Sequence, residues 1–167
     1  KHGLGEATVL VVWGPLMVGG AYYAAAGHLP FGIVAASVPY ALLCTAVLMG
    51  KHIDKIPWDW RDGTNTLPVL LGEPRARALT QGMMVSFYVL VVLLVGTGTL
   101  PIAALIVLLA LPKLAKVWGP FSQPKPAEAP ENFPIWPLWF AALAFVHTRR
   151  AGGLLVLGLI VGVILGW

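Results

Sequence analysis

Long apolar runs, separated by a few polar segments, most constrain how this chain of 167 residues can fold. Several runs approach the roughly 20 residues that an α-helix needs to cross a bilayer, and they are too long for buried strands. Hydrophobic residues make up 58% of the chain and charged residues 11%, and the mean hydropathy is +0.82. A soluble domain carries about a quarter charged residues. We therefore exclude a soluble globular fold and expect an all-α membrane protein whose exterior faces lipid.

The runs predict about five transmembrane helices. A tight turn at 27–30 separates the first two, and a Gly-Thr turn at 96–99 separates the third from the fourth. Proline and glycine inside the runs are tolerated in membrane helices, because neighbouring helices satisfy the freed backbone groups. The predicted helices are 7–26, 31–49, 79–95, 100–111 and 152–167.

The segments between these helices are of three kinds. Residues 51–77 form a charged, aspartate-rich loop, and residues 118–132 read as an extended proline-rich loop. Residues 134–147 are too few to cross the bilayer comfortably and are rich in Trp and Phe, which favour the headgroup region. We predict an interfacial helix there, and a single transmembrane helical domain over 1–167.

The basic residues predict the orientation. With the helices placed as above, nearly all Lys and Arg residues fall on one side of the membrane, and His28 and the Gly-Thr turn lie on the other. The positive-inside rule makes the charged side cytoplasmic. We expect an integral protein of the plasma membrane with its charged loops, including Lys1, in the cytoplasm.

Other classes of function are disfavoured. Aromatic and basic residues do not alternate in the way that would suggest nucleic-acid binding. The chain has a single cysteine, Cys44, which excludes a disulfide framework. A transporter is disfavoured because no ionisable residue is expected in the middle of a span. Glu6 either lines the cytoplasmic mouth or belongs to a solvated terminus.

The charged loop carries most of the candidate chemistry. It holds all three aspartates of the chain and five of its eleven Lys and Arg residues. Mg²⁺ binds carboxylate and phosphate oxygens together, and Lys and Arg neutralise the remaining phosphate charge. The loop therefore fits a magnesium–diphosphate site. The alternative is a solvated loop whose charges only set the topology.

A defined spacing in the same loop narrows the choice. Asp59 is followed by Gly63, then by TLPV at 66–69 and by Gly72. Upstream lie GLGE at 3–6 and GGAYYAAAG at 19–27. These residues resemble the second aspartate-rich motif of the UbiA superfamily of intramembrane prenyltransferases and, upstream, its 1,4-dihydroxy-2-naphthoate branch of menaquinone synthesis.

The resemblance implies a fold, an activity and a set of site residues. The fold is a nine-helix bundle, of which this chain would supply the last five helices. The activity is transfer of an isoprenyl group from a polyprenyl diphosphate to an aromatic acceptor, with Mg²⁺ as cofactor. The implied metal ligands are Asp59 and Asp54, the implied diphosphate-binding residues are Lys51, Lys55, Arg61 and Arg75, and weaker candidates are Asp62, His52 and Arg149.

The loop departs from the family pattern at two positions. Lys55 stands where the family has its first aspartate, and His52 stands where it often has Asn. The nearest carboxylate, Asp54, is five residues from Asp59, which on an ideal helix turns the two about 140° apart. Pro57 interrupts the helix between them, so Asp54 could still reach the metal.

Two functions remain open at this point. The intact stretch from Asp59 to Gly72 favours the enzyme. Lys55, together with the absence of a first aspartate motif from the sequence, favours a non-catalytic UbiA-like subunit of a larger respiratory or photosynthetic complex. We expect residues carrying the first motif to precede Lys1.

Overall fold

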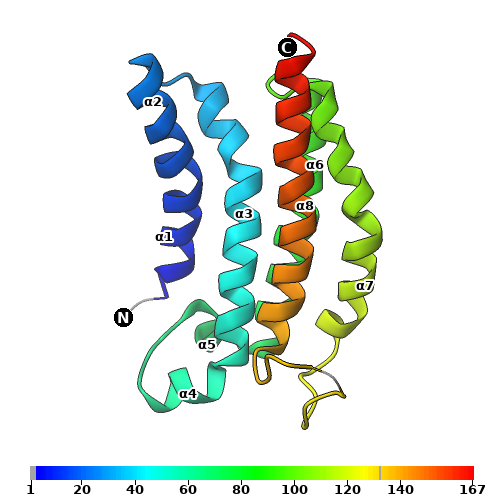
Figure 1. Ribbon diagram of the computed structural model, residues 1–167. Coiled ribbons are helices and arrows are strands. Elements are labelled where there is room, and N and C mark those ends of the chain that lie inside the picture. Colours follow the sequence, from blue (N-terminus) through cyan, green and yellow to red (C-terminus); the bar gives the residue numbers. More distant parts are fainter. Residues whose placement is uncertain (1–2, 132) are drawn as a thin grey trace.

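The computed structural model describes residues 3–131 and 133–167, and within them it contains helices and no strand (Figure 1). The helices are α1 (Gly5–Val11), η1 (Val12–Gly19), α2 (Gly20–Ala26), α3 (Phe31–Asp54), α4 (Ile56–Arg61), α5 (Leu67–Leu71), α6 (Glu73–Gly96), η2 (Ile102–Ala110), α7 (Leu111–Ser122) and α8 (Trp139–Ile164).

Five helical stretches are long and apolar enough to cross a membrane, which confirms the all-α membrane fold. Three of them, the first, second and fourth, start within two residues of the predicted positions. The stretches are Gly5–Ala26, Phe31–Asp54, Glu73–Gly96, Ile102–Ser122 and Trp139–Ile164.

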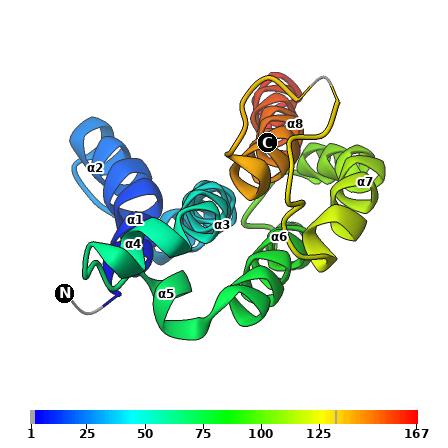
Figure 2. The ribbon, with the colours of Figure 1, turned by 90° about the horizontal axis from the view of Figure 1, so that it is seen from below.

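Helix α3 occupies the centre of the bundle. It contacts η1 on one side and α6 and α8 on the other, and η2 packs against α8 (Figure 2). Small residues allow the helices to approach closely. A Cβ atom added at Gly50 would lie 2.6 Å from the Phe140 carbonyl oxygen, and one added at Gly158 would lie 2.6 Å from that of Ala103.

The first span is widened in its middle. Pro15 lies inside η1, a π-helix of eight residues. Proline has no N–H to donate, which breaks the regular α-helical ladder, and a π-helix is one way to absorb such a break. On the face of this turn that meets α3, a Cβ added at Gly14 would lie 2.7 Å from the Ala41 Cβ.

The predicted interfacial helix is wrong over residues 139–147, which form the start of α8. The helix does not end at the polar residues 147–150. In the structure His147 is fully buried, with its Nε2 2.9 Å from the Tyr88 hydroxyl. Thr148 Oγ1 donates to the Leu43 carbonyl at 3.2 Å. Neighbouring helices thus supply partners for His147 Nε2 and for the Thr148 hydroxyl, and α8 continues through both residues.

The continuous α8 also corrects the expectation that no ionisable residue lies inside a span. His147, Arg149 and Arg150 all lie within the candidate span Trp139–Ile164.

Both predicted loops are more helical than expected. Within 51–77, α3 runs on to Asp54, α4 and α5 follow, and α6 begins at Glu73. Helix α7 extends to Ser122, so residues 118–122 of the predicted proline-rich loop are helical. The end of α7 is held by α6, because Gln81 Nε2 donates to Ser122 Oγ at 2.9 Å. Lys1 and Asn132, which entered the orientation and loop predictions, lie outside the described residues.

Candidate functional site

The aspartate-rich loop, the beginning of α1 and the connection between α7 and α8 lie at the same end of the molecule (Figure 1). The last turn of α3 presents His52 and Asp54 there, and the short helix α4 presents Asp59. The break between α3 and α4 falls at Lys55, two residues before Pro57. The site is therefore assembled where segments distant in the sequence meet.

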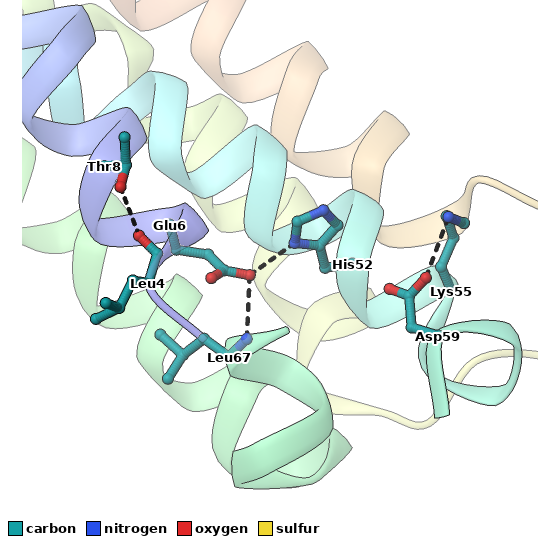
Figure 3. Close-up of polar contacts among 7 residues, drawn as sticks. All are labelled: Leu4, Glu6, Thr8, His52, Lys55, Asp59 and Leu67. Carbon is teal, nitrogen blue, oxygen red and sulfur yellow. Dashed lines mark hydrogen bonds and ion pairs between the residues drawn. The ribbon is translucent and has the colours of Figure 1, made fainter. Parts of the chain in front are cut away.

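Asp59 is buried, with a residue exposure of 5%, and its two carboxylate oxygens differ. Oδ1 lies 3.1 Å from Lys55 Nζ, one helical turn away (Figure 3). Oδ2 is buried and has no hydrogen-bond partner. The lysine that replaces an aspartate of the family pattern thus pairs with the aspartate that remains. A buried carboxylate oxygen without a partner is costly, and a further cation would satisfy it.

Asp54 has different partners. Its Oδ1 accepts a hydrogen bond from the Phe140 amide at 3.1 Å, and its Oδ2 accepts one from the Ala141 amide at 2.9 Å. These amides belong to the first turn of α8, where free N–H groups and the helix dipole favour a negative charge. The structure therefore directs both carboxylate oxygens of Asp54 to α8, whereas Asp59 pairs with Lys55.

Lys125 completes the surroundings of Asp54. Its Nζ lies 3.4 Å from Asp54 Oδ1, contacts the Pro137 carbonyl, and lies 4.8 Å from the centre of the Trp136 ring. A cavity of about 400 Å³ opens beside Asp54 and Lys125, between α4 and the α7–α8 connection. The Asp54–Lys125 pair therefore joins the end of α3 to that connection.

Glu6 is a site residue whose role the sequence left open. It is 1% exposed, so a solvated terminus is excluded. Its Oε1 accepts a hydrogen bond from the Leu67 amide at 3.2 Å and lies 2.6 Å from His52 Nδ1 (Figure 3). Its Oε2 is buried without a partner. Glu6 thus connects α1, α3 and the start of the TLPV segment, beside a cavity of about 300 Å³.

The remaining predicted residues lie in two places. Lys51, Arg61, Arg75 and Asp62 are exposed at the loop end. Arg149 is elsewhere, in a cavity between α7 and α8. No group of three or more His, Cys, Asp or Glu side chains that could hold a metal is found in the part of the chain that the structure describes.

Comparison with known proteins identifies the family. Residues 1–143 match the UbiA prenyltransferase family. The chain is 37% identical over 82 residues to a 1,4-dihydroxy-2-naphthoate octaprenyltransferase of Mycobacterium tuberculosis, covering 49% of this chain and 28% of the relative. The enzymes of the same name from Haemophilus influenzae and Escherichia coli are 39% and 41% identical over 75 residues, covering 45% of this chain and 24% of each relative.

The matched stretches span about a quarter of the length of these relatives. No solved structure matches the chain. The family match covers most of the chain and agrees with its all-α membrane fold and its aspartate-rich loop. The chain belongs to the UbiA prenyltransferase family.

Proposed function

We propose that this chain takes part in the transfer of an isoprenyl group from a polyprenyl diphosphate to an aromatic acceptor within the membrane. The relatives named above act on 1,4-dihydroxy-2-naphthoate, and we propose the same class of acceptor here. The observation that carries the proposal is the buried, unpartnered Oδ2 of Asp59 beside Lys55, in a chain of this family.

Asp59 is suited to supply one ligand of a divalent-metal site. Mg²⁺ is usually bound by one or two carboxylates together with substrate phosphates and water, so one free carboxylate oxygen is an appropriate contribution. When bound, Mg²⁺ stabilises the charge that develops on the departing diphosphate. The side chain of Lys55 is 44% exposed, so its ammonium group can face a phosphate while it orients Asp59. Lys51, Arg61 and Arg75 would neutralise further phosphate charge.

An apolar cavity supports a lipid-like substrate. It has a volume of about 420 Å³ and lies between η1, α3 and α8, toward the end of the bundle opposite the loop. Met17, Ile33, Tyr40 and Leu155 are among its lining residues. A prenyl chain whose diphosphate is held at the loop would run along α3 toward this cavity.

We also propose that the loop end faces the cytoplasm and that the protein resides in the plasma membrane. The exposed cations Lys51, Arg61 and Arg75 gather at that end, as the positive-inside rule requires. A cytoplasmic loop would meet a diphosphate substrate on the side where such compounds are made.

A second function is a non-catalytic subunit of a larger membrane complex. The ion pair between Lys55 and Asp59 favours it, because a lysine there uses one of the carboxylate oxygens that a metal would otherwise share.

The test is prenyl transfer by the full-length protein carrying Asp59→Asn. This change keeps the shape of the side chain and removes the charge that holds a divalent ion. We expect a loss of about a thousandfold in rate, because metal assistance to the leaving group is worth several kcal/mol. The matched control is Asp62→Asn, three residues along and exposed, which should retain most activity.

Near-normal transfer by the Asp59→Asn protein would show that the metal assignment is wrong. If the unmutated full-length protein neither transfers prenyl groups nor binds magnesium diphosphate, and co-purifies with a membrane complex, the non-catalytic function is correct.

A further inference from the structure

A second charged site lies between α7 and α8, away from the aspartate-rich loop. Here a cavity of about 550 Å³ is lined by four cationic residues, Lys113, Lys116, Arg149 and Arg150. Leu109, Pro112 and Val146 form its apolar walls. We call this cavity the basic groove.

The basic groove has no internal counter-charge. No carboxylate lines it, and across residues 3–131 and 133–167 none of its four cations forms an ion pair or a side-chain hydrogen bond. Four like charges around one cavity repel one another, and the repulsion grows as water is excluded. An anion bound in the groove would offset this cost.

The groove lies inside the spans rather than at their ends. Thr148, next to Arg149, bonds to the carbonyl of Leu43. Leu43 is seven residues before Gly50, which packs on Phe140 near the start of α8. Seven residues correspond to about 10 Å of helix, so this part of α8 is about 10 Å farther into the bundle than the loop end. Cations at such a depth are expensive and are normally paired.

We propose that the basic groove binds the headgroup of an anionic phospholipid. Basic pockets between transmembrane helices suit acidic headgroups, because the phosphate pairs with Lys and Arg. The apolar walls favour a lipid over a soluble anion, since Leu109 and Val146 are exposed along the groove and offer a surface to acyl chains. Arg149, first considered for the substrate diphosphate, belongs to this second site.

The test compares the full-length protein in phosphatidylcholine membranes with and without phosphatidylglycerol. Ligand binding to the folded state raises the Tm, so phosphatidylglycerol should raise the Tm of the unmutated protein and remain bound in native mass spectrometry. The double variant Lys113→Gln with Arg150→Gln should lose this shift. Each cation near a membrane surface is worth about 1 kcal/mol toward acidic lipid, or about fivefold in affinity.

Two controls separate lipid binding from folding. Lys113→Arg with Arg150→Lys keeps both charges and should keep the shift. If the double glutamine variant has a lower Tm in phosphatidylcholine alone, the single variant Lys116→Gln replaces it, because that side chain is exposed. It should weaken phosphatidylglycerol binding about fivefold.

Two outcomes would overturn the proposal. One is an equal response to phosphatidylglycerol in the unmutated protein and in the variants that remove charge. The other is a Tm shift produced by soluble inorganic diphosphate in phosphatidylcholine membranes that the double glutamine variant loses, which would assign the groove, rather than the aspartate-rich loop, to a soluble anion.

Discussion

At the residue scale, Asp54 and Asp59 show how two nearby carboxylates acquire different roles. Both are buried, yet Asp54 has both oxygens engaged by α8 amides, whereas Asp59 keeps one oxygen without a partner. Helix geometry predicts this divergence, because a spacing of five residues places them on different faces. In the structure the break before Pro57 leaves Asp54 bonded to α8 and Asp59 paired with Lys55.

Replacing Asp54 should therefore affect stability more than chemistry. Asp54→Asn removes the charge that pairs with Lys125, replaces one of the two oxygens that accept from α8 amides by an NH2 group that cannot accept, and weakens the remaining bond. We expect unfolding to be easier by about 1.5–3 kcal/mol, with less than a tenfold loss of prenyl transfer per folded molecule. Thermal unfolding and transfer rates of the full-length protein measure the two effects. Unchanged stability with a loss as large as that of Asp59→Asn would instead make Asp54 a metal ligand.

Glu6 gives a second prediction at this scale. Glu6→Ala leaves the Leu67 amide and His52 without their buried acceptor, and an unsatisfied buried group costs about 1–3 kcal/mol. We expect faster hydrogen exchange of the amides from 64 to 71, together with weaker prenyl transfer. Glu6→Gln retains an acceptor oxygen and should behave more nearly like the unmutated protein. Unchanged exchange in Glu6→Ala would show that Glu6 does not hold the TLPV segment.

At the element scale, the crossing of α3 and α8 depends on a glycine. A Cβ at position 50 would lie 2.6 Å from the Phe140 carbonyl oxygen, and backbone cannot move aside as a flexible side chain can. The same crossing places Asp54 against the first turn of α8. Packing of this pair therefore positions the loop end of the molecule.

Gly50→Ala should destabilise the protein even though alanine favours a helix by about 0.5–1 kcal/mol. Gly82→Ala is the matched control, because it lies inside α6 and a Cβ there meets nothing within 4 Å. Thermal unfolding in one detergent compares the two. If the Gly50→Ala protein is as stable as the Gly82→Ala control, α3 and α8 do not approach each other as closely as in the structure.

At the scale of the whole molecule, the connections divide between two ends. The aspartate-rich loop and the α7–α8 connection lie at one end, and the turns around His28 and Gly98 lie at the other (Figure 1). The exposed cations of the loop end make it the cytoplasmic end in our proposal.

Labelling of engineered cysteines tests this orientation. In intact cells, a membrane-impermeant thiol reagent should leave Asp62→Cys and Glu128→Cys unmodified and should label His28→Cys. All three positions are exposed, so accessibility differs only by the side of the membrane. Permeabilised cells should show labelling at all three. Labelling of either loop cysteine from outside would reverse the proposed topology.

The sequence by itself determined the membrane class, the number of candidate spans and the position of the Asp59–Gly72 motif. These are local properties, because crossing a bilayer depends on the length and apolarity of one continuous run. Local composition also placed the predicted metal and diphosphate residues, apart from Arg149, in one loop.

Only the tertiary structure decided where α8 begins and what the buried polar residues do. His147 lies inside α8 with its Nε2 against the Tyr88 hydroxyl. Asp54 accepts hydrogen bonds from the amides of Phe140 and Ala141, 86 and 87 positions along the chain. Glu6 accepts one from the Leu67 amide, 61 positions along the chain. A polar group inside a membrane bundle is costly unless a partner satisfies it. When that partner comes from a distant helix, no local pattern in the sequence contains it.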